Sequence, residues 1–152
     1  MKWNEVSALV RADVIEMSHR AKTAHLASAL SCVDILTVIY TSIMELNQKS
    51  NRKKDHDKFI LSKGHAATAL YAILSYKGII NRKDLLNYGK KGSFLEEHPS
   101  PKQKGVEAAT GSLGHGLPIA NGIALANKIR GKNSRVFVLM SDGECNEGSV
   151  WE

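Results

Sequence analysis

The chain has 152 residues, of which 43% are hydrophobic and 24% are charged. This length is enough for one domain with its own core, and the composition excludes disordered and collagen-like classes of protein. The formal net charge of +6 favours anionic partners, and phosphorylated small molecules satisfy that charge as well as nucleic acids do.

Cysteine usage and apolar runs bear on the location of the protein. Cys32 and Cys145 lie far apart in the sequence, so we expect neither a disulfide framework nor a paired-cysteine zinc site, and we expect a cytoplasmic location. Charged residues interrupt the N-terminal segment, and no apolar run reaches 18 residues. The sequence therefore predicts neither a secretory signal nor a membrane-spanning segment.

The first third of the chain predicts two helices. Apolar residues at helical spacing predict an amphipathic helix over 4–22 (Val6, Leu9, Val10, Val14, Met17). Ser31 and Asp34 have the spacing of a capping box and predict a second helix that begins at Ser31. The small residues of "TAHLASALS" lie between the two, and the charged segment 47–58 is expected to be a solvated loop.

The remaining sequence predicts an α/β order. A strand is expected over 58–62, then a helix that closes on Gly78, and a short helix capped by Asn81 and Asp84 that reaches Tyr88. Residues 89–116 show little periodicity. Pro118 opens a helix that runs to Ile129, and "SRVFVLM" gives a second strand. We predict a mostly parallel sheet with helices on both faces, left incomplete by only two clear strands.

Three stretches are predicted to converge if these strands are parallel neighbours, because ligands bind at the carboxyl ends of such strands. They are "SKGH" (62–65), "TGSLGHG" (110–116) and "SDGECNEG" (141–148). Asp142 follows the second strand, where a carboxylate often binds a metal, although a hard cation requires several oxygen ligands. His65 lies where a strand becomes a helix, so it could face an anion or simply cap the helix.

Other residues give weaker signals. The loop "GSLGHG" suits a phosphate but does not match the dinucleotide-binding glycine pattern, and it could be a plain helix entry. Four histidines (His25, His65, His98, His115) lie beside turns of small residues, where imidazoles suit proton transfer near pH 7. No zinc-ligand spacing occurs among them. Cys145 has no predicted base beside it, which favours an inert thiol.

Four stretches taken together resemble the N-terminal part of transketolase. They are "TAHLASALSCVDILTVIY", "FILSKGHAATALYAIL", "EEHPSP…GVEAATGSLGHGLPIANGIALANKI" and "VFVLMSDGECNEGSVWE". The resemblance covers nearly the whole chain, and the closest likeness is to the split form, whose N-terminal section is a separate subunit. It implies that residues 1–152 are the N-terminal portion of a diphosphate-binding domain with the thiamine diphosphate-binding fold.

The resemblance also implies roles for particular residues. Asp142 corresponds to the first ligand of Mg²⁺ (or Ca²⁺ or Mn²⁺), and Gly143 lets the diphosphate of thiamine diphosphate approach the backbone. His65 corresponds to a histidine near the diphosphate. The remaining correspondences are backbone positions around the cofactor (Gly111, Leu113), substrate-side histidines (His25, His98) and an acidic residue that links paired active sites across a dimer (Glu147).

The implied activity is transfer of a two-carbon ketol unit from a ketose phosphate to an aldose phosphate. The implied partners are a C-terminal transketolase section, further copies of the complete enzyme and sugar phosphates, with no nucleic acid and no membrane. The Asn that completes the metal site in the family would lie beyond Glu152. We therefore expect these 152 residues to be C-terminally truncated, and inactive alone.

The sequence departs from the family pattern at three places. Ser141 replaces the first glycine of G-D-G, Ser112 replaces a common proline, and "HLASALS" replaces a glycine-rich stretch. Ser141 would be strained if its φ were positive. Alternatives to transketolase are a non-catalytic remnant or interaction module, another thiamine diphosphate enzyme such as 1-deoxyxylulose-5-phosphate synthase, and a basic nucleic-acid binder.

Overall fold

The computed structural model describes residues 2–46 and 56–152, so most of the predicted 47–58 loop lies outside the described residues. The elements, in chain order, are α1 (Trp3–Ala21), α2 (Leu26–Leu30), α3 (Val33–Val38), the π-helical turn η1 (Ile39–Ile43), β1 (Lys58–Leu61), the 3₁₀ turn η2 (Gly64–Ala66), α4 (Ala67–Tyr76), the 3₁₀ helix η3 (Arg82–Asn87), α5 (Gly116–Ile129), β2 (Val136–Leu139), the 3₁₀ turn η4 (Gly143–Asn146) and α6 (Gly148–Trp151).

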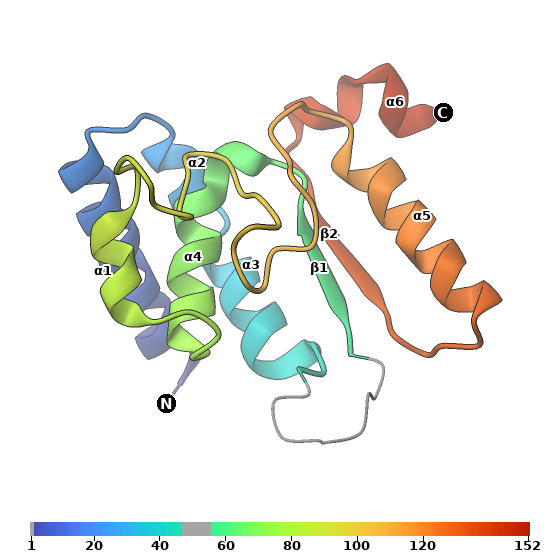
Figure 1. Ribbon diagram of the computed structural model, residues 1–152, viewed down its shortest axis with the longest axis horizontal. Helices are drawn as coiled ribbons and strands as arrows, with labels where there is room; N and C mark the ends of the chain where they lie inside the picture. The colour runs from blue at the N-terminus through green and yellow to red at the C-terminus, as the bar shows by residue number, and fades with distance from the viewer. Residues whose placement is uncertain (1, 47–55) are drawn as a thin grey trace.

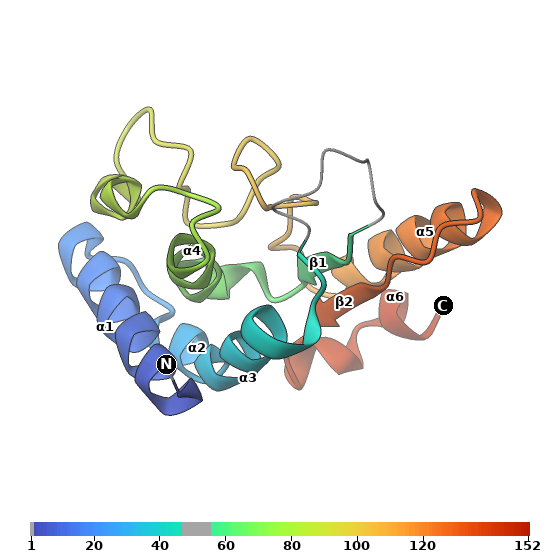
Figure 2. The same cartoon turned by 90° about the horizontal axis from the view of Figure 1, so that it is seen from below.

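Helices cover both sides of a small parallel sheet, as the sequence predicts. Strands β1 and β2 pair in parallel, in a register that runs from Lys58 opposite Val136 to Leu61 opposite Leu139. Helices α1–α4 lie on one side of the strands and α5 on the other, which Figures 1 and 2 show from two directions. β1 is mostly buried, whereas β2 is half-buried throughout. No further strand pairs with β2 in the part of the chain that the structure describes.

The core lies on the α1–α4 side of the sheet. α4 is buried over nearly its whole length, because α1, α2, α3 and η3 pack against it. The apolar stripe of α1 faces it, as predicted, and four of its five residues are buried (Val6, Val10, Val14, Met17). The fifth, Leu9, is 42% exposed. It lies beside Val10 at the edge of the stripe, where helical geometry turns it toward solvent.

The prediction of a second helix that begins at Ser31 is wrong about where the helix begins and about its being a single helix. A short helix, α2, already occupies part of "TAHLASALS", and the chain bends before α3 begins at Val33. Ser31 and Asp34 do not form a capping box. The Ser31 hydroxyl donates to the carbonyl of Ser28, and the carboxylate of Asp34 pairs with Arg11 of α1 at 2.5 Å. A contact with a distant helix therefore replaces the local cap that the spacing indicates.

Residues 26–43 are apolar and long enough to cross a membrane by length and composition, which is at odds with the expectation that no such run occurs. In the structure, however, α2, α3 and η1 divide this segment. Val33, Leu36 and Tyr40 of this segment are buried in the core, whereas Leu26, Ile35 and Ile43 are exposed. Packing in the core therefore accounts for the buried apolar residues of the segment.

The later helices follow the prediction with shifted bounds. The side chain of Asn81 accepts from the backbone N–H of Lys83 at 3.2 Å, so its predicted capping role is confirmed, although the element is a 3₁₀ helix. α5 starts at Gly116, which places Pro118 in its first turn. Proline is tolerated there because the N–H groups of the first turn have no partner within the helix.

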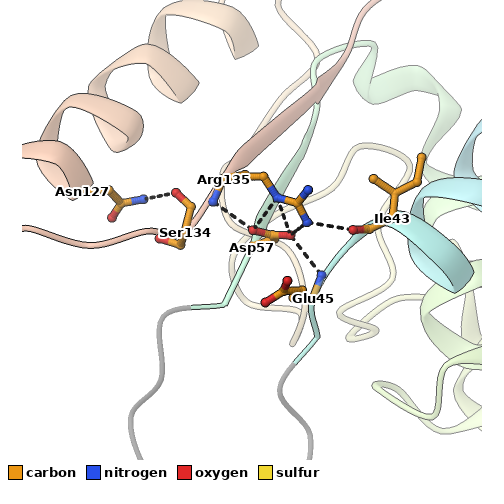
Figure 3. A network of polar contacts seen from close by, with 6 residues as sticks. All are labelled: Ile43, Glu45, Asp57, Asn127, Ser134 and Arg135. Atoms are coloured by element: carbon orange, nitrogen blue, oxygen red, sulfur yellow. Dashed lines mark hydrogen bonds and ion pairs between the residues drawn. The ribbon is translucent and has the colours of Figure 1, made fainter.

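A polar clip joins the N-terminal ends of the two strands (Figure 3). The Arg135 guanidinium donates to the Asp57 carboxylate, with the shortest N–O distance 2.6 Å, and to the carbonyl of Ile43 at 2.7 Å. The carboxylate also accepts from the backbone N–H groups of Glu45 and Arg135. Asp57 is 5% exposed. It therefore ties the chain that enters β1 to the chain that enters β2.

We expect Asp57→Ala to lower the free energy of unfolding by about 2 kcal/mol, because two backbone N–H groups and a guanidinium lose their acceptor. Chemical denaturation of both proteins measures this difference. The matched control is Asp34→Ala, which removes an ion pair between exposed side chains and should change stability by less than about 1 kcal/mol. Equal losses in the two variants would contradict the assignment of a clip to Asp57.

The clip also predicts a pH dependence. Burial alone would raise the pKa of Asp57, but the hydrogen bonds from Arg135 and from the two backbone N–H groups outweigh it, so the pKa lies below its ordinary value of 3.8. The stabilisation is therefore present above pH 3.8 and is lost as the pH falls through the folded-state pKa. Wild-type protein should lose more stability on acidification through this range than Asp57→Ala does.

Candidate active site

The three predicted stretches meet at the carboxyl ends of β1 and β2, at the top of the sheet in Figure 1. Thr110 begins the second stretch, and its hydroxyl donates to the carbonyl of Leu61 at 2.6 Å. A Cβ on Gly64 would lie 2.6 Å from the carbonyl carbon of Thr110, so the backbones of the first two stretches touch. Glu144 of the third stretch accepts from Ser62 and from the Gly114 N–H. The predicted convergence is confirmed.

Two predicted histidines contact each other at this end of the sheet. The ring centroids of His25 and His65 lie 5.3 Å apart. His65 is half-buried in η2, directly after β1, while His25 is exposed and immediately precedes α2. The backbone of His25 has φ +70°, a left-handed conformation that is uncommon for a residue with a side chain. This conformation places the His25 ring beside His65.

His98 joins the same cluster through Gly111. A Cβ on Gly111 would lie 2.7 Å from Cδ2 of His98, and Gly111 has φ +148°. Glycine is therefore required at this position both for the backbone conformation and for the close approach of the imidazole. A Cβ on Gly64, directly before His65, would lie 2.7 Å from the backbone nitrogen of Gly111, so Gly111 lies between the segment of His65 and the ring of His98. The fourth histidine of the sequence pattern, His115, is exposed and immediately precedes α5.

Lys63 belongs to this cluster, although the sequence analysis did not single it out. It is 7% exposed, and its ammonium donates to the Ser31 hydroxyl at 3.2 Å. A lysine is rarely so buried unless it is paired or functional. The feature of the sequence that could have indicated Lys63 is its position, directly before Gly64 and His65 at the end of a buried strand. A positive group therefore lies close to His65, the central histidine of the cluster.

The pKa of His65 lies below its ordinary value of 6.5. Burial is the main cause, and the positive charges of Lys63, His25 and His98 add to it, while Glu144 acts in the opposite direction. His65 is therefore neutral at pH 7. A lowered folded-state pKa also means that any stability linked to this residue is present above pH 6.5 and declines as the pH falls.

We expect Lys63→Met to raise the pKa of His65 toward, but not to, 6.5, because the substitution removes a neighbouring charge and leaves the burial. The titration of the His65 ring in nuclear magnetic resonance spectra measures this shift. Lys128→Met, an exposed substitution on α5, is the control. A His65 titration that is the same in wild type and Lys63→Met would show that the lysine charge does not reach the ring.

Asp142 lies where the sequence places it, exposed and directly after the turn from β2. Its side chain makes no hydrogen bond with the part of the chain that the structure describes, so the carboxylate is available to a ligand. Across residues 2–46 and 56–152, no group of three or more His, Cys, Asp or Glu side chains is arranged to hold a metal. Asp142 can therefore offer a hard cation a single carboxylate.

The neighbours of Asp142 fit an open site. Non-glycine residues with positive φ are Lys22 and His25 within the described ranges, so the strain considered for Ser141 does not arise. A Cβ on Gly143 would meet nothing within 4 Å in this structure. Space is therefore open beside the backbone at Gly143, and the approach of a diphosphate there stays a prediction.

Leu113 and Glu147 lie on either side of Gly114. Leu113 is half-buried and directly precedes Gly114, which has φ +83°. Glu147 is exposed at the start of α6, and a Cβ on Gly114 would lie 2.7 Å from the Cβ of Glu147. The hydroxyl of Ser149 donates to the carbonyl of Gly114 at 3.1 Å. The glycine-rich loop and the last turn of the chain are thus packed together.

Glu144 is a second residue of the site, after Lys63, that the sequence did not indicate. It lies two positions after Asp142 in the same turn, yet it is completely buried. A turn that carries Asp142, Glu144 and Glu147 gives no sign in the sequence of which carboxylate faces inward. Only the convergence of Ser62 and Gly114 on this point could have indicated it.

These features define an α/β ligand-binding domain, with histidines, a lysine and a carboxylate gathered at the carboxyl ends of parallel strands. Residues 3–152 match the family described as "Transketolase, thiamine diphosphate binding domain". The chain belongs to this family.

Relatives of this chain include a separate subunit as well as longer enzymes. It is 39% identical over 142 residues to an apulose-4-phosphate transketolase subunit from Phocaeicola vulgatus, and the match covers 93% of this chain and 50% of the relative. It is 42% identical over 144 residues to human transketolase, and the match covers 94% of this chain and 23% of the human protein. The chain therefore spans about half of one relative and about a quarter of the other.

Solved structures show the same fold. The transketolase of Campylobacter jejuni superposes with a TM-score of 0.90 at 29% sequence identity, covering 99% of this chain and 26% of that protein. The transketolase of Leishmania mexicana superposes with a TM-score of 0.88 at 26% identity, covering 99% of this chain and 24% of that protein. The expected thiamine diphosphate-binding fold is confirmed.

Proposed function

We propose that this chain is the part of a transketolase that binds the Mg²⁺–diphosphate end of thiamine diphosphate during transfer of a two-carbon ketol unit from a ketose phosphate to an aldose phosphate. The observation that carries the proposal is that the segments of His65, Gly111 and Asp142 meet at the carboxyl ends of β1 and β2, where His25 contacts His65 and His98 lies against Gly111.

The residues at this end of the sheet suit an anionic, metal-bound group. Asp142 would hold the Mg²⁺, and the neutral His65 with the nearby Lys63 would face the diphosphate. The backbone at Gly111 and Leu113 would line the cofactor, and Gly143 would leave room for the diphosphate to approach. One carboxylate is a poor site for Mg²⁺ alone, so the other ligands would come from the diphosphate, from water and from the rest of the enzyme.

Thiamine diphosphate supplies, when bound, the carbanion chemistry that cleaves a bond beside a carbonyl. His25 and His98 would then take and return protons at the hydroxyl groups of the sugar substrate, and both are exposed, so a substrate can reach them. The histidine cluster thus divides into a diphosphate-facing member, His65, and two substrate-facing members.

We also propose that the chain functions with a C-terminal transketolase section, in an enzyme with more than one copy of each part. The name of the P. vulgatus relative identifies it as one subunit of its enzyme, which supports a divided arrangement. Glu147 is exposed beside the glycine-rich loop, where it could reach across to a second active site.

A hybrid enzyme tests the proposal. Residues 3–152 of this chain replace the matching segment of human transketolase, whose remaining sequence supplies the other sections; this protein is called the hybrid transketolase below. We expect the hybrid transketolase to transfer a ketol unit from a ketose phosphate to an aldose phosphate only with thiamine diphosphate and Mg²⁺. Unmodified human transketolase is assayed in parallel.

The hybrid transketolase also separates the alternatives. Binding of thiamine diphosphate without ketol transfer would favour a different thiamine diphosphate reaction. A folded protein that assembles but does not bind the cofactor would favour a non-catalytic interaction module. Either result would contradict the proposed transketolase function.

A further inference from the structure

The carboxylate of Glu144 lies at the centre of the candidate site. The residue is 0% exposed and belongs to the short turn η4. A buried carboxylate is strongly unfavourable unless hydrogen bonds replace the water that it loses. Its neighbours must therefore supply several donors, and the identity of these donors indicates its role.

Three donors surround Glu144, and each comes from a different stretch of the site. Oε1 accepts from the hydroxyl of Ser62 and from the backbone N–H of Gly114, the latter at 2.8 Å. Oε2 accepts from the backbone N–H of Ser141 at 3.2 Å. The backbone N–H of Glu144 in turn donates to the Ser141 hydroxyl at 3.3 Å. One side chain thus joins the segments that follow β1, precede α5 and follow β2.

The segments that Glu144 joins are closely packed. A Cβ on Gly116 would overlap the side chain of Ser62, and a Cβ on Gly114 would overlap the hydroxyl of Ser149. At Gly114 and Gly116 the backbone thus packs directly against serine side chains. The carboxylate of Glu144, which bonds to all three segments, therefore sets the spacing between them. Because all three donors point at it, a side chain without two acceptor oxygens cannot satisfy them together.

The donors lie directly beside the residues assigned to the cofactor. Ser62 lies three positions before His65, Gly114 directly follows Leu113, and Ser141 directly precedes Asp142. A shift at any donor therefore moves a group that would contact the diphosphate or its metal. The exposed Glu147, by comparison, accepts no such set of bonds among the described residues.

We propose that Glu144 is a positioning residue, which sets the spacing of the His65, Leu113 and Asp142 segments for the diphosphate of the cofactor. This inference rests on the proposed function and adds to it a residue that does not touch the cofactor. Its consequence is specific: loss of the carboxylate weakens cofactor binding, while the reaction in the bound state is preserved.

The first test measures the kinetics of Glu144→Gln in the hybrid transketolase. The variant keeps the shape of the side chain but turns an amide N–H₂ toward one of the donors. We expect the KM for thiamine diphosphate to rise about tenfold or more, the scale seen when groups that orient metal ligands are replaced. The kcat at saturating cofactor should stay within about twofold of wild type. A general loss of structure would not raise the KM for thiamine diphosphate and leave kcat unchanged.

One further variant keeps the test decisive if Glu144→Gln does not fold, and a control variant accompanies it. Ser62→Ala removes one donor and leaves the carboxylate with its two backbone partners, so a smaller rise in KM with unchanged kcat is expected. Glu107→Gln is the matched control, because this glutamate pairs with Lys58 at the opposite end of β1, at 2.9 Å. It should leave the KM for thiamine diphosphate unchanged.

The second test does not require a cofactor. Amide hydrogen exchange is followed by nuclear magnetic resonance in the 152-residue chain, as wild type and as Glu144→Gln. We expect exchange at Gly114 and Ser141 to become at least tenfold faster in the variant, because both N–H groups lose or weaken their acceptor. Ser62→Ala is compared in the same way and should affect the Gly114 amide less.

The outcomes separate the two proposals. If the hybrid transketolase without further substitutions shows no ketol transfer, the proposed function is contradicted. The exchange experiment is independent of that result: unchanged exchange at Gly114 and Ser141 in Glu144→Gln would contradict the positioning role of Glu144. An active hybrid whose KM is unchanged by both Glu144→Gln and Ser62→Ala contradicts the positioning role alone. A fall in kcat without a rise in KM would contradict it as well.

Discussion

Asp142→Asn is expected to weaken the Mg²⁺-dependent binding of thiamine diphosphate to the hybrid transketolase by about 100-fold or more. Replacing groups that merely orient a metal ligand already costs 10–100-fold in affinity, and Asp142 is proposed to be the ligand itself. A hard cation prefers an anionic oxygen, and the amide of asparagine offers only a neutral one. Calorimetric titration of the cofactor at fixed Mg²⁺ concentration measures the loss.

The fold should tolerate this substitution. Asp142 is exposed and its side chain makes no hydrogen bond with the described residues, so the stability should stay within about 0.5 kcal/mol of wild type. Asp84→Asn, an exposed substitution in η3, is the matched control and should leave cofactor binding unchanged. Equal cofactor affinity in wild type and Asp142→Asn would remove Asp142 from the metal site.

His25→Asn is expected to lower the kcat of the hybrid transketolase by a factor of about 100 to 10,000, the range that a general acid or base contributes. Asparagine is chosen because His25 has φ +70°, and asparagine accepts this left-handed conformation better than other residues with side chains. The substitution therefore removes the imidazole and preserves the backbone bend before α2. Steady-state kinetics with a ketose phosphate and an aldose phosphate measure the effect.

Cofactor binding provides the control within the same protein. Because His25 is assigned to the substrate side, the affinity for thiamine diphosphate should change by no more than about twofold. His19→Asn, at an exposed position in the last turn of α1, should leave kcat unchanged. A His25→Asn variant with normal kcat would show that this histidine does not transfer protons in the rate-limiting part of the reaction.

The parts of the fold that the sequence predicts well are those with strong local patterns. The apolar run before Ser141 and the alanine-rich stretch after His65 became β2 and α4, because short buried strands and good helix formers keep their preference inside a core. The convergence of the three site stretches followed from the parallel order alone. Parallel neighbours bring their carboxyl ends together whatever the loops contain.

The errors occur where distant contacts override local spacing. Ser31 and Asp34 have the spacing of a capping box, but Arg11 draws Asp34 to α1 and the helix begins at Val33 instead. Glu144 was missed for a related reason. Its burial depends on Ser62 and Gly114, which lie 82 and 30 residues away, and no pattern within the turn reports on either.

The location of the metal in a crystal structure of the hybrid transketolase tests the central claim most directly. The protein is crystallised with thiamine diphosphate and Mn²⁺ in place of Mg²⁺, and anomalous scattering locates the metal. We predict a metal peak at coordinating distance from a carboxylate oxygen of Asp142, with the diphosphate lying between Asp142 and His65. A metal and diphosphate bound elsewhere, or bound without Asp142, would contradict the assignment of this chain to the diphosphate end of the cofactor.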